Sequence, residues 1–76
     1  MIKVIYHAAL KRNAHDVKGI RNTAIKHQEG MTIKNISEIL GLDEVGLVIL
    51  NGTLTRENAI VKDGDCVEMH PFVGGG

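Results

Sequence analysis

The residues best suited to chemistry stand at the end of the sequence, in the run Gly74-Gly75-Gly76. Glycine has no Cβ and adopts extended and positive-φ conformations alike, so such a run can enter a narrow channel in another protein. Its reactive group would be the carboxylate of Gly76, which is an anion at neutral pH because its reference pKa is ~3.3–3.7. An anionic carboxylate is a poor electrophile, so it would have to be activated before it could take part in acyl transfer.

Cysteine and histidine are the other residue types that could carry chemistry. Cys66 falls within an expected strand without a persuasive His and Asp constellation, which favours a structural role. The histidines lack the tight spacing of a zinc site, although His7 and His70 could approach each other if the first and last strands pair. We therefore expect surface histidines, no bound metal and no bound cofactor. The four positions are His7, His15, His27 and His70.

Length and charge limit the functional classes. Seventy-six residues suffice for one compact domain, and nine Lys and Arg balance nine Asp and Glu, which argues against binding to nucleic acid or an anionic membrane. The N-terminal apolar stretch is interrupted by Lys3 and Lys11-Arg12, so it predicts neither a signal peptide nor a membrane span. A single cysteine favours a reducing compartment. We expect a cytoplasmic protein.

Periodicity predicts the elements that position the tail. Strands are expected over 1–7, 20–27, 46–50, 53–55 and 66–70, with one helical turn possible within 8–19. The run 46–50 is read as a central strand, and Asn51-Gly52 after it predicts a hairpin turn. The last strand should point Val67 and Met69 inward and end at Pro71, which has no backbone N–H to donate.

One helix is expected between the second and third strands. Thr32 is its candidate N-cap and Gly41 its candidate C-cap. Its apolar stripe is expected to contain Ile33, Ile36, Ile39 and Leu40.

The order of these elements defines the fold class. One crossover helix among several tight reversals excludes a doubly wound sheet. The expected architecture is α+β, with a mixed sheet of four to five strands packed on one main helix. Residues 1–73 should form this domain, and 74–76 a flexible glycine tail.

Several linked pieces of sequence carry a resemblance to a known family. They are 1–4, Gly30-Met31-Thr32, Leu50-Asn51-Gly52, 62–67 and Pro71 shortly before the glycine run. In this order they resemble the ubiquitin-like β-grasp sulfur carriers, which include the small subunit of molybdopterin synthase and the thiamine-pathway sulfur carrier. The family usually ends in two glycines after a Pro-Pro pair, whereas three glycines follow Phe72-Val73 here, so the reach of the tail could differ by one residue.

The resemblance implies a function for the tail. A ubiquitin-activating-type adenylating enzyme would use ATP to form an acyl-adenylate on Gly76. A sulfur donor such as a cysteine desulfurase or rhodanese would then convert it to a thiocarboxylate, which donates sulfur in cofactor biosynthesis. The ~20 residues between the first strand and Thr32 look more like the molybdopterin-type carriers, whose acceptor is the large subunit of the synthase.

Three other functions use the same features. They are a thiamine-pathway sulfur carrier, a ubiquitin-like modifier joined through Gly76 to lysines of other proteins, and an interaction domain with an inert tail. In each of them the chain itself is not an enzyme.

The tail also predicts a docking surface. Ordering a flexible tail costs roughly 1–2 kcal/mol per residue in backbone entropy, so the folded body must supply compensating contacts. We expect them on an apolar sheet face and beside the tail. The candidate residues are Ile5, Leu47, Ile49 and Phe72.

Overall fold

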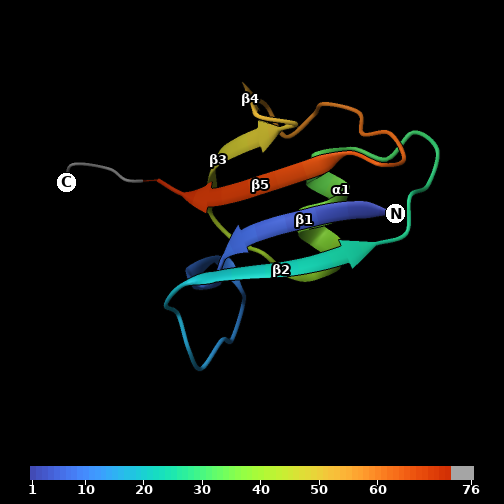
Figure 1. Ribbon diagram of the computed structural model, residues 1–76. Coiled ribbons are helices and arrows are strands. Elements are labelled where there is room, and N and C mark those ends of the chain that lie inside the picture. The colour runs from blue at the N-terminus through green and yellow to red at the C-terminus, as the bar shows by residue number, and fades with distance from the viewer. Residues whose placement is uncertain (73–76) are drawn as a thin grey trace.

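The computed structural model describes residues 1–72, in which a five-stranded sheet carries one α-helix across one of its faces (Figure 1). The strand order is β2-β1-β5-β3-β4, with β1 and β5 parallel and every other neighbouring pair antiparallel. The elements in chain order are β1 (Ile2–His7), the 3₁₀ turn η1 (Ala8–Leu10), β2 (Ile20–Ile25), α1 (Ile33–Leu40), β3 (Val45–Leu50), β4 (Thr53–Thr55) and β5 (Cys66–Pro71). This mixed sheet confirms the expected α+β, ubiquitin-like β-grasp fold.

The structure confirms all five expected strands and corrects two details. The middle strand of the sheet is β5, and β3 lies between β5 and β4. The last strand ends at Pro71 as expected, but it includes this residue, one beyond the expected 66–70, and Pro71 pairs with Val45. The register of β3 against β5 shifts between Val45 and Leu47, and proline is tolerated at such a bulge because the regular ladder is interrupted there.

Asn51 and Gly52 form the expected tight turn between β3 and β4. Their φ angles are 50° and 83°, the left-handed values that a type I′ hairpin turn requires. Asn51 also joins this turn to β5, because its Oδ1 accepts a hydrogen bond from the backbone N–H of Cys66 at 2.8 Å. Its Nδ2 donates to Asp65 Oδ1 at 2.9 Å. The turn residue therefore fixes the start of the strand that leads to the tail.

The helix has the predicted caps. Thr32 Oγ1 accepts a hydrogen bond from the Asn35 backbone N–H at 3.2 Å, and Asn35 Oδ1 accepts one from the Thr32 N–H at 2.9 Å. Gly41 ends the helix in the left-handed conformation, with φ 68°. This reciprocal capping satisfies two backbone donors that the first turn leaves free.

The expected stripe on the helix is wrong at one position. Ile33 and Ile36 are fully buried, but Ile39 is 59% exposed. At about 100° of rotation per residue, Ile39 lies about 90° from the centre of the stripe formed by Ile33, Ile36 and Leu40. The sheet therefore covers the other three residues and leaves Ile39 outside the contact.

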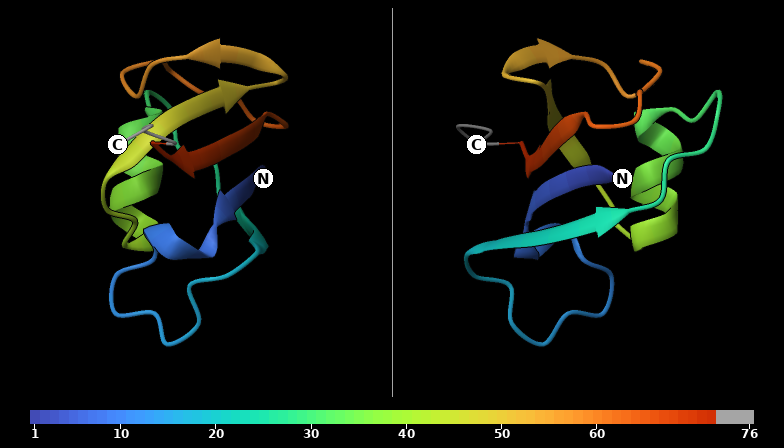
Figure 2. Two further views of the ribbon diagram at one scale, coloured as in Figure 1. Left: turned by 90° about the vertical axis from the view of Figure 1, so that its left-hand side faces the viewer. Right: turned by 45° about the vertical axis from the view of Figure 1, so that its right-hand side comes forward.

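The core lies between α1 and one face of the sheet, and Figure 2 shows the helix on that face alone. Alternate strand residues point toward the helix, and Val67 and Met69 of β5 are fully buried as expected. Burying each large aliphatic side chain contributes about 1.5–3 kcal/mol. The buried apolar residues of this cluster are Ile2, Val4, Leu10, Met31, Ile33, Ile36, Leu42, Val48, Val61, Val67 and Met69. No helix in the described residues is long and apolar enough to cross a membrane.

Candidate functional site

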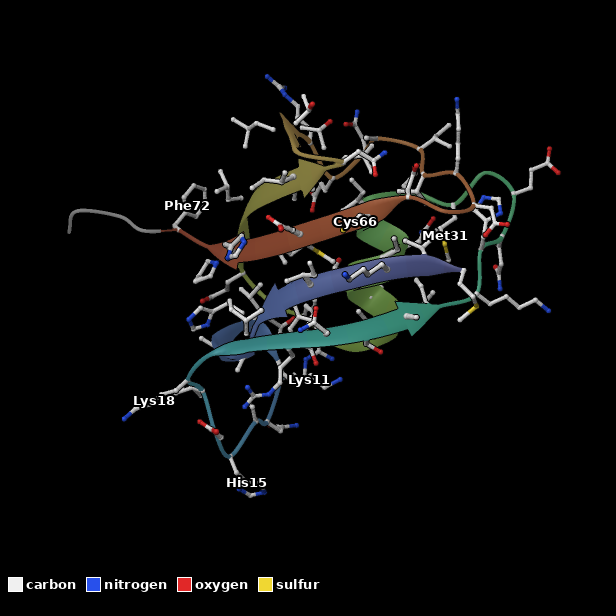
Figure 3. All side chains as sticks on the ribbon, in the orientation of Figure 1. Lys11, His15, Lys18, Met31, Cys66 and Phe72 are labelled. Atoms are coloured by element: carbon white, nitrogen blue, oxygen red, sulfur yellow. The ribbon has the colours of Figure 1, made fainter. Side chains whose placement is uncertain are left out.

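The middle strand of the sheet leads to the candidate tail. Strand β5 is held on both sides, by β1 and by β3, and its last residues are followed by Phe72 (Figure 3). The predicted reactive residues Gly74, Gly75 and Gly76 lie outside the described residues. The structure describes the folded domain that precedes them in the sequence. The last strand of this domain is β5, which has the most extensive pairing in the sheet.

Phe72 packs tightly against Gly46 of β3. A Cβ built on Gly46 would lie 2.4 Å from the Phe72 backbone nitrogen and 2.6 Å from its Cγ, closer than side chains approach one another. Only glycine permits this contact, which occurs at the β3 bulge. Phe72 is nevertheless 80% exposed, so most of its ring is available to a partner. Sequence analysis did not identify Gly46 as a site residue. A glycine at the start of an apolar strand often marks a bulge or a close approach of another segment, and this pattern could have indicated it.

The sheet face opposite α1, here called the open face, brings three docking candidates together. Ile5, Leu47 and Ile49 alternate with residues that point into the core, so they share this face. Leu47 is 39% exposed, and Ile5 and Ile49 are half-buried. Phe72, the fourth candidate, follows the end of β5 and contacts the β3 strand that carries Leu47 and Ile49.

The register shows how the open face is built. A row of paired residues crosses the sheet through Asn22, Ile5, Glu68, Ile49 and Leu54. A second row at the tail end places Leu47 opposite His70. Leu54 is 66% exposed and extends the apolar surface to the β4 edge. Sequence analysis omitted Leu54, although its place after the hairpin turn puts it opposite Ile49.

A pocket lies beside Phe72. Its volume is about 530 Å³, and Val45, Pro71 and Phe72 line one part of it. Ala9, Leu10, Asp43 and Glu44 complete the lining. The pocket thus joins the residues before the glycine run to the η1 turn and to the loop between α1 and β3.

An ion pair fixes the wall of this pocket. Arg12 donates two hydrogen bonds to Asp43, from Nε at 2.8 Å and from Nη2 at 2.7 Å. These hydrogen bonds hold the pKa of Asp43 below its ordinary range and raise the pKa of Arg12. The backbone N–H of Asp43 also donates to the Leu10 carbonyl at 2.8 Å. Arg12, one of the two basic residues that interrupt the N-terminal apolar stretch, therefore has a structural role beside this pocket.

The candidate cysteine and histidines form no catalytic arrangement in residues 1–72. Cys66 is half-buried on the open face, opposite Lys3. The first and last strands do pair, so His7 and His70 come at neighbouring strand ends, but His7 Nδ1 accepts a hydrogen bond from the Ala9 N–H at 3.0 Å. Among the described residues, no three His, Cys, Asp or Glu side chains gather as metal ligands would.

A mixed β-grasp sheet with one helix across one face is the architecture of ubiquitin-like domains. The family model described as Mut7-C ubiquitin matches residues 1–74, and the chain belongs to this family. This is a ubiquitin-like domain related to the sulfur carriers that the sequence resembles. No solved structure matches the chain.

Proposed function

We propose that the chain is a sulfur carrier whose reactive group is the carboxylate of a terminal Gly76. The observation that carries the proposal is the route of β5, which runs between β1 and β3 and leads to Phe72, after which the sequence continues into the run Gly74-Gly75-Gly76. Membership of a ubiquitin-like family related to sulfur carriers supports it.

The proposed chemistry takes place in partner proteins. A carboxylate oxygen of Gly76 attacks the α-phosphorus of ATP, and pyrophosphate leaves. The terminal sulfur of a persulfide on the donor protein attacks the acyl carbon, and AMP leaves. A thiol then reduces the resulting acyl disulfide and releases the thiocarboxylate. The chain contributes a glycine segment that fits a narrow active site and a body that holds it there.

The open face is proposed as the docking surface for these partners. A tail held in an active site loses backbone freedom, at roughly 1–2 kcal/mol for each residue that becomes fixed on binding. Contacts of Ile5, Leu47, Ile49 and Phe72 would offset this cost, since removing apolar surface from water favours association and only the surplus over the ordering cost appears as affinity. Exposed Phe72 is the strongest single candidate because aromatic anchors dominate many interfaces.

Three kinds of partner follow. They are an adenylating enzyme that uses ATP, a sulfur donor such as a cysteine desulfurase or rhodanese, and the large subunit of a molybdopterin-type synthase as acceptor. The thiamine pathway is the alternative destination of the sulfur.

The mass of the chain isolated from its native cell tests the proposal. A chain that ends at Gly76 and carries one sulfur in place of one terminal oxygen supports a sulfur carrier. Covalent adducts between Gly76 and lysines of other proteins would instead make it a protein modifier. A longer chain, or full function after deletion of Gly75-Gly76, would contradict both and leave an interaction domain.

A further inference from the structure

A single carboxylate stands in the middle of the open face. Glu68 of β5 pairs with Ile5 of β1 on one side and with Ile49 of β3 on the other. Leu54 follows Ile49 on β4, so apolar side chains flank Glu68 on both sides along the row. Its side chain is 37% exposed, so solvent reaches it in the free chain.

This carboxylate has little compensation within the described residues. Its ion pair there is with His70, whose Nε2 lies 3.8 Å from Glu68 Oε2, too far for a hydrogen bond. Lys3 lies on the same face but pairs with Cys66, which comes two residues before Glu68 in β5. Water therefore supplies most of the solvation of Glu68 in the free chain.

Docking on the open face would remove that water. A carboxylate buried without a partner loses its hydration with no replacement, which would oppose the gain from the surrounding apolar contacts. An interface that covers Ile5 and Ile49 must cover Glu68 as well, because it lies between them. A surface that is apolar throughout is therefore a poor partner for this face.

The geometry points to a partner that presents one arginine or lysine to Glu68 at the centre of an otherwise apolar contact. The identity of that partner, the adenylating enzyme, rests on the proposed function. A second copy of the chain fits poorly, because symmetric pairing of two open faces would bring two Glu68 carboxylates together. Glu68 thus selects a protein of complementary charge and opposes self-association through the same apolar residues.

Calorimetric binding to the purified adenylating enzyme tests this inference. Glu68→Gln keeps the shape of the side chain and leaves the partner's cation unpaired, so we expect binding about 30-fold weaker or more. Glu68→Lys should weaken binding further, and reversal of the contacting cation to Glu in the enzyme should restore it. Glu57→Gln is the matched control, since Glu57 is exposed and lies between β4 and β5. This variant should bind the enzyme with the affinity of the original chain.

The inference is overturned if Glu68→Gln binds as tightly as the original chain, or if the enzyme does not bind the chain at all. Urea unfolding of each variant shows that the comparison is made between folded proteins. Activation is read separately, as AMP adduct on the chain with ATP present. Glu68-dependent binding without any adduct would refute the proposed function alone, whereas adduct formation with unchanged Glu68→Gln binding would refute this inference alone.

Discussion

The contact between Phe72 and Gly46 shows how one residue sets the position of another that is distant in sequence. A Cβ added to Gly46 would lie nearest to the backbone nitrogen of Phe72. A backbone atom cannot rotate out of the way as the end of a side chain can. Phe72 is therefore held against β3, and its position is set by the sheet.

Gly46→Ala should destabilise the fold by about 1–3 kcal/mol, because the added Cβ forces the backbone at Phe72 to shift. The measurement is the free energy of urea unfolding. Phe72→Ala in the same chain should relieve only part of the loss, since it removes the ring contacts and leaves the backbone contact. Unfolding free energies equal to within about 0.5 kcal/mol in Gly46→Ala and the original chain would contradict the close packing.

Asp65 gives a prediction for the dependence of stability on pH. Its carboxylate accepts hydrogen bonds from Asn51 Nδ2 at 2.9 Å and from the Lys62 backbone N–H at 2.7 Å. These hydrogen bonds, that from Asn51 first, lower its pKa in the folded state. The pKa of Asp65 in the folded state lies below its unfolded value of ~3.9. The ionised carboxylate therefore stabilises the fold fully at pH values above ~3.9, and this stabilisation is lost as pH falls through the folded pKa.

When the pH is lowered from 7 to below ~4, the free energy of unfolding should therefore fall less in Asp65→Asn than in the original chain. Urea unfolding across that range measures the slope. Glu29→Gln, an exposed carboxyl outside this hydrogen-bond network, is the control and should follow the original curve. Identical slopes for Asp65→Asn and the original chain would show that these hydrogen bonds do not favour the ionised carboxylate.

At the scale of the elements, local patterns predicted most of the fold. The alternation of apolar and polar residues predicted the strands, and Asn51-Gly52 predicted the hairpin turn. Thr32 and Gly41 predicted the two ends of the helix. These signals succeed because each depends on residues close together in sequence. The strand order, the place of β5 in the middle and the bulge at Val45 depend on pairing between distant segments, which periodicity does not encode.

The capping box should contribute measurably, because α1 has only eight residues and few backbone hydrogen bonds of its own. Thr32→Ala removes the acceptor for the Asn35 N–H and should lower the unfolding free energy by about 1 kcal/mol. Thr32→Ser retains the hydroxyl and should keep most of the stability. Thermal or urea unfolding of the two variants measures the difference, and equal stabilities would argue against the cap.

At the scale of the whole molecule, the candidate site is a surface rather than a cavity. Sequence analysis placed Ile5, Leu47 and Ile49 on one face of the sheet, because apolar residues that alternate with core residues along a strand point away from the core. Phe72 was selected for its place beside the tail, and the docking role of all four residues stays a prediction. It could not find that Glu68 lies between Ile5 and Ile49, since that arrangement depends on the register of β5 against both of its neighbours. Gly74 to Gly76 and the proposed partners rest on sequence and family alone.

Leu47→Lys should lower kcat/KM for adenylation of the chain about tenfold or more, because it puts a charge into the proposed apolar contact. Its unfolding free energy should stay within about 1 kcal/mol of the original, since Leu47 already faces solvent. Ile60→Lys is the matched control: Ile60 is 62% exposed but pairs with Thr32 at the start of the helix. If the two variants are adenylated equally well, the open face is not the docking surface.

The central claim is that sulfur is carried on the carboxylate of Gly76. Its most direct test is the intact mass of the chain after incubation with the adenylating enzyme, ATP, a persulfide donor and a thiol reductant. The account predicts replacement of one oxygen by one sulfur, located at Gly76 by fragmentation and absent from a variant lacking Gly76. A chain that returns unchanged, or that carries its new mass on any other residue, would contradict it.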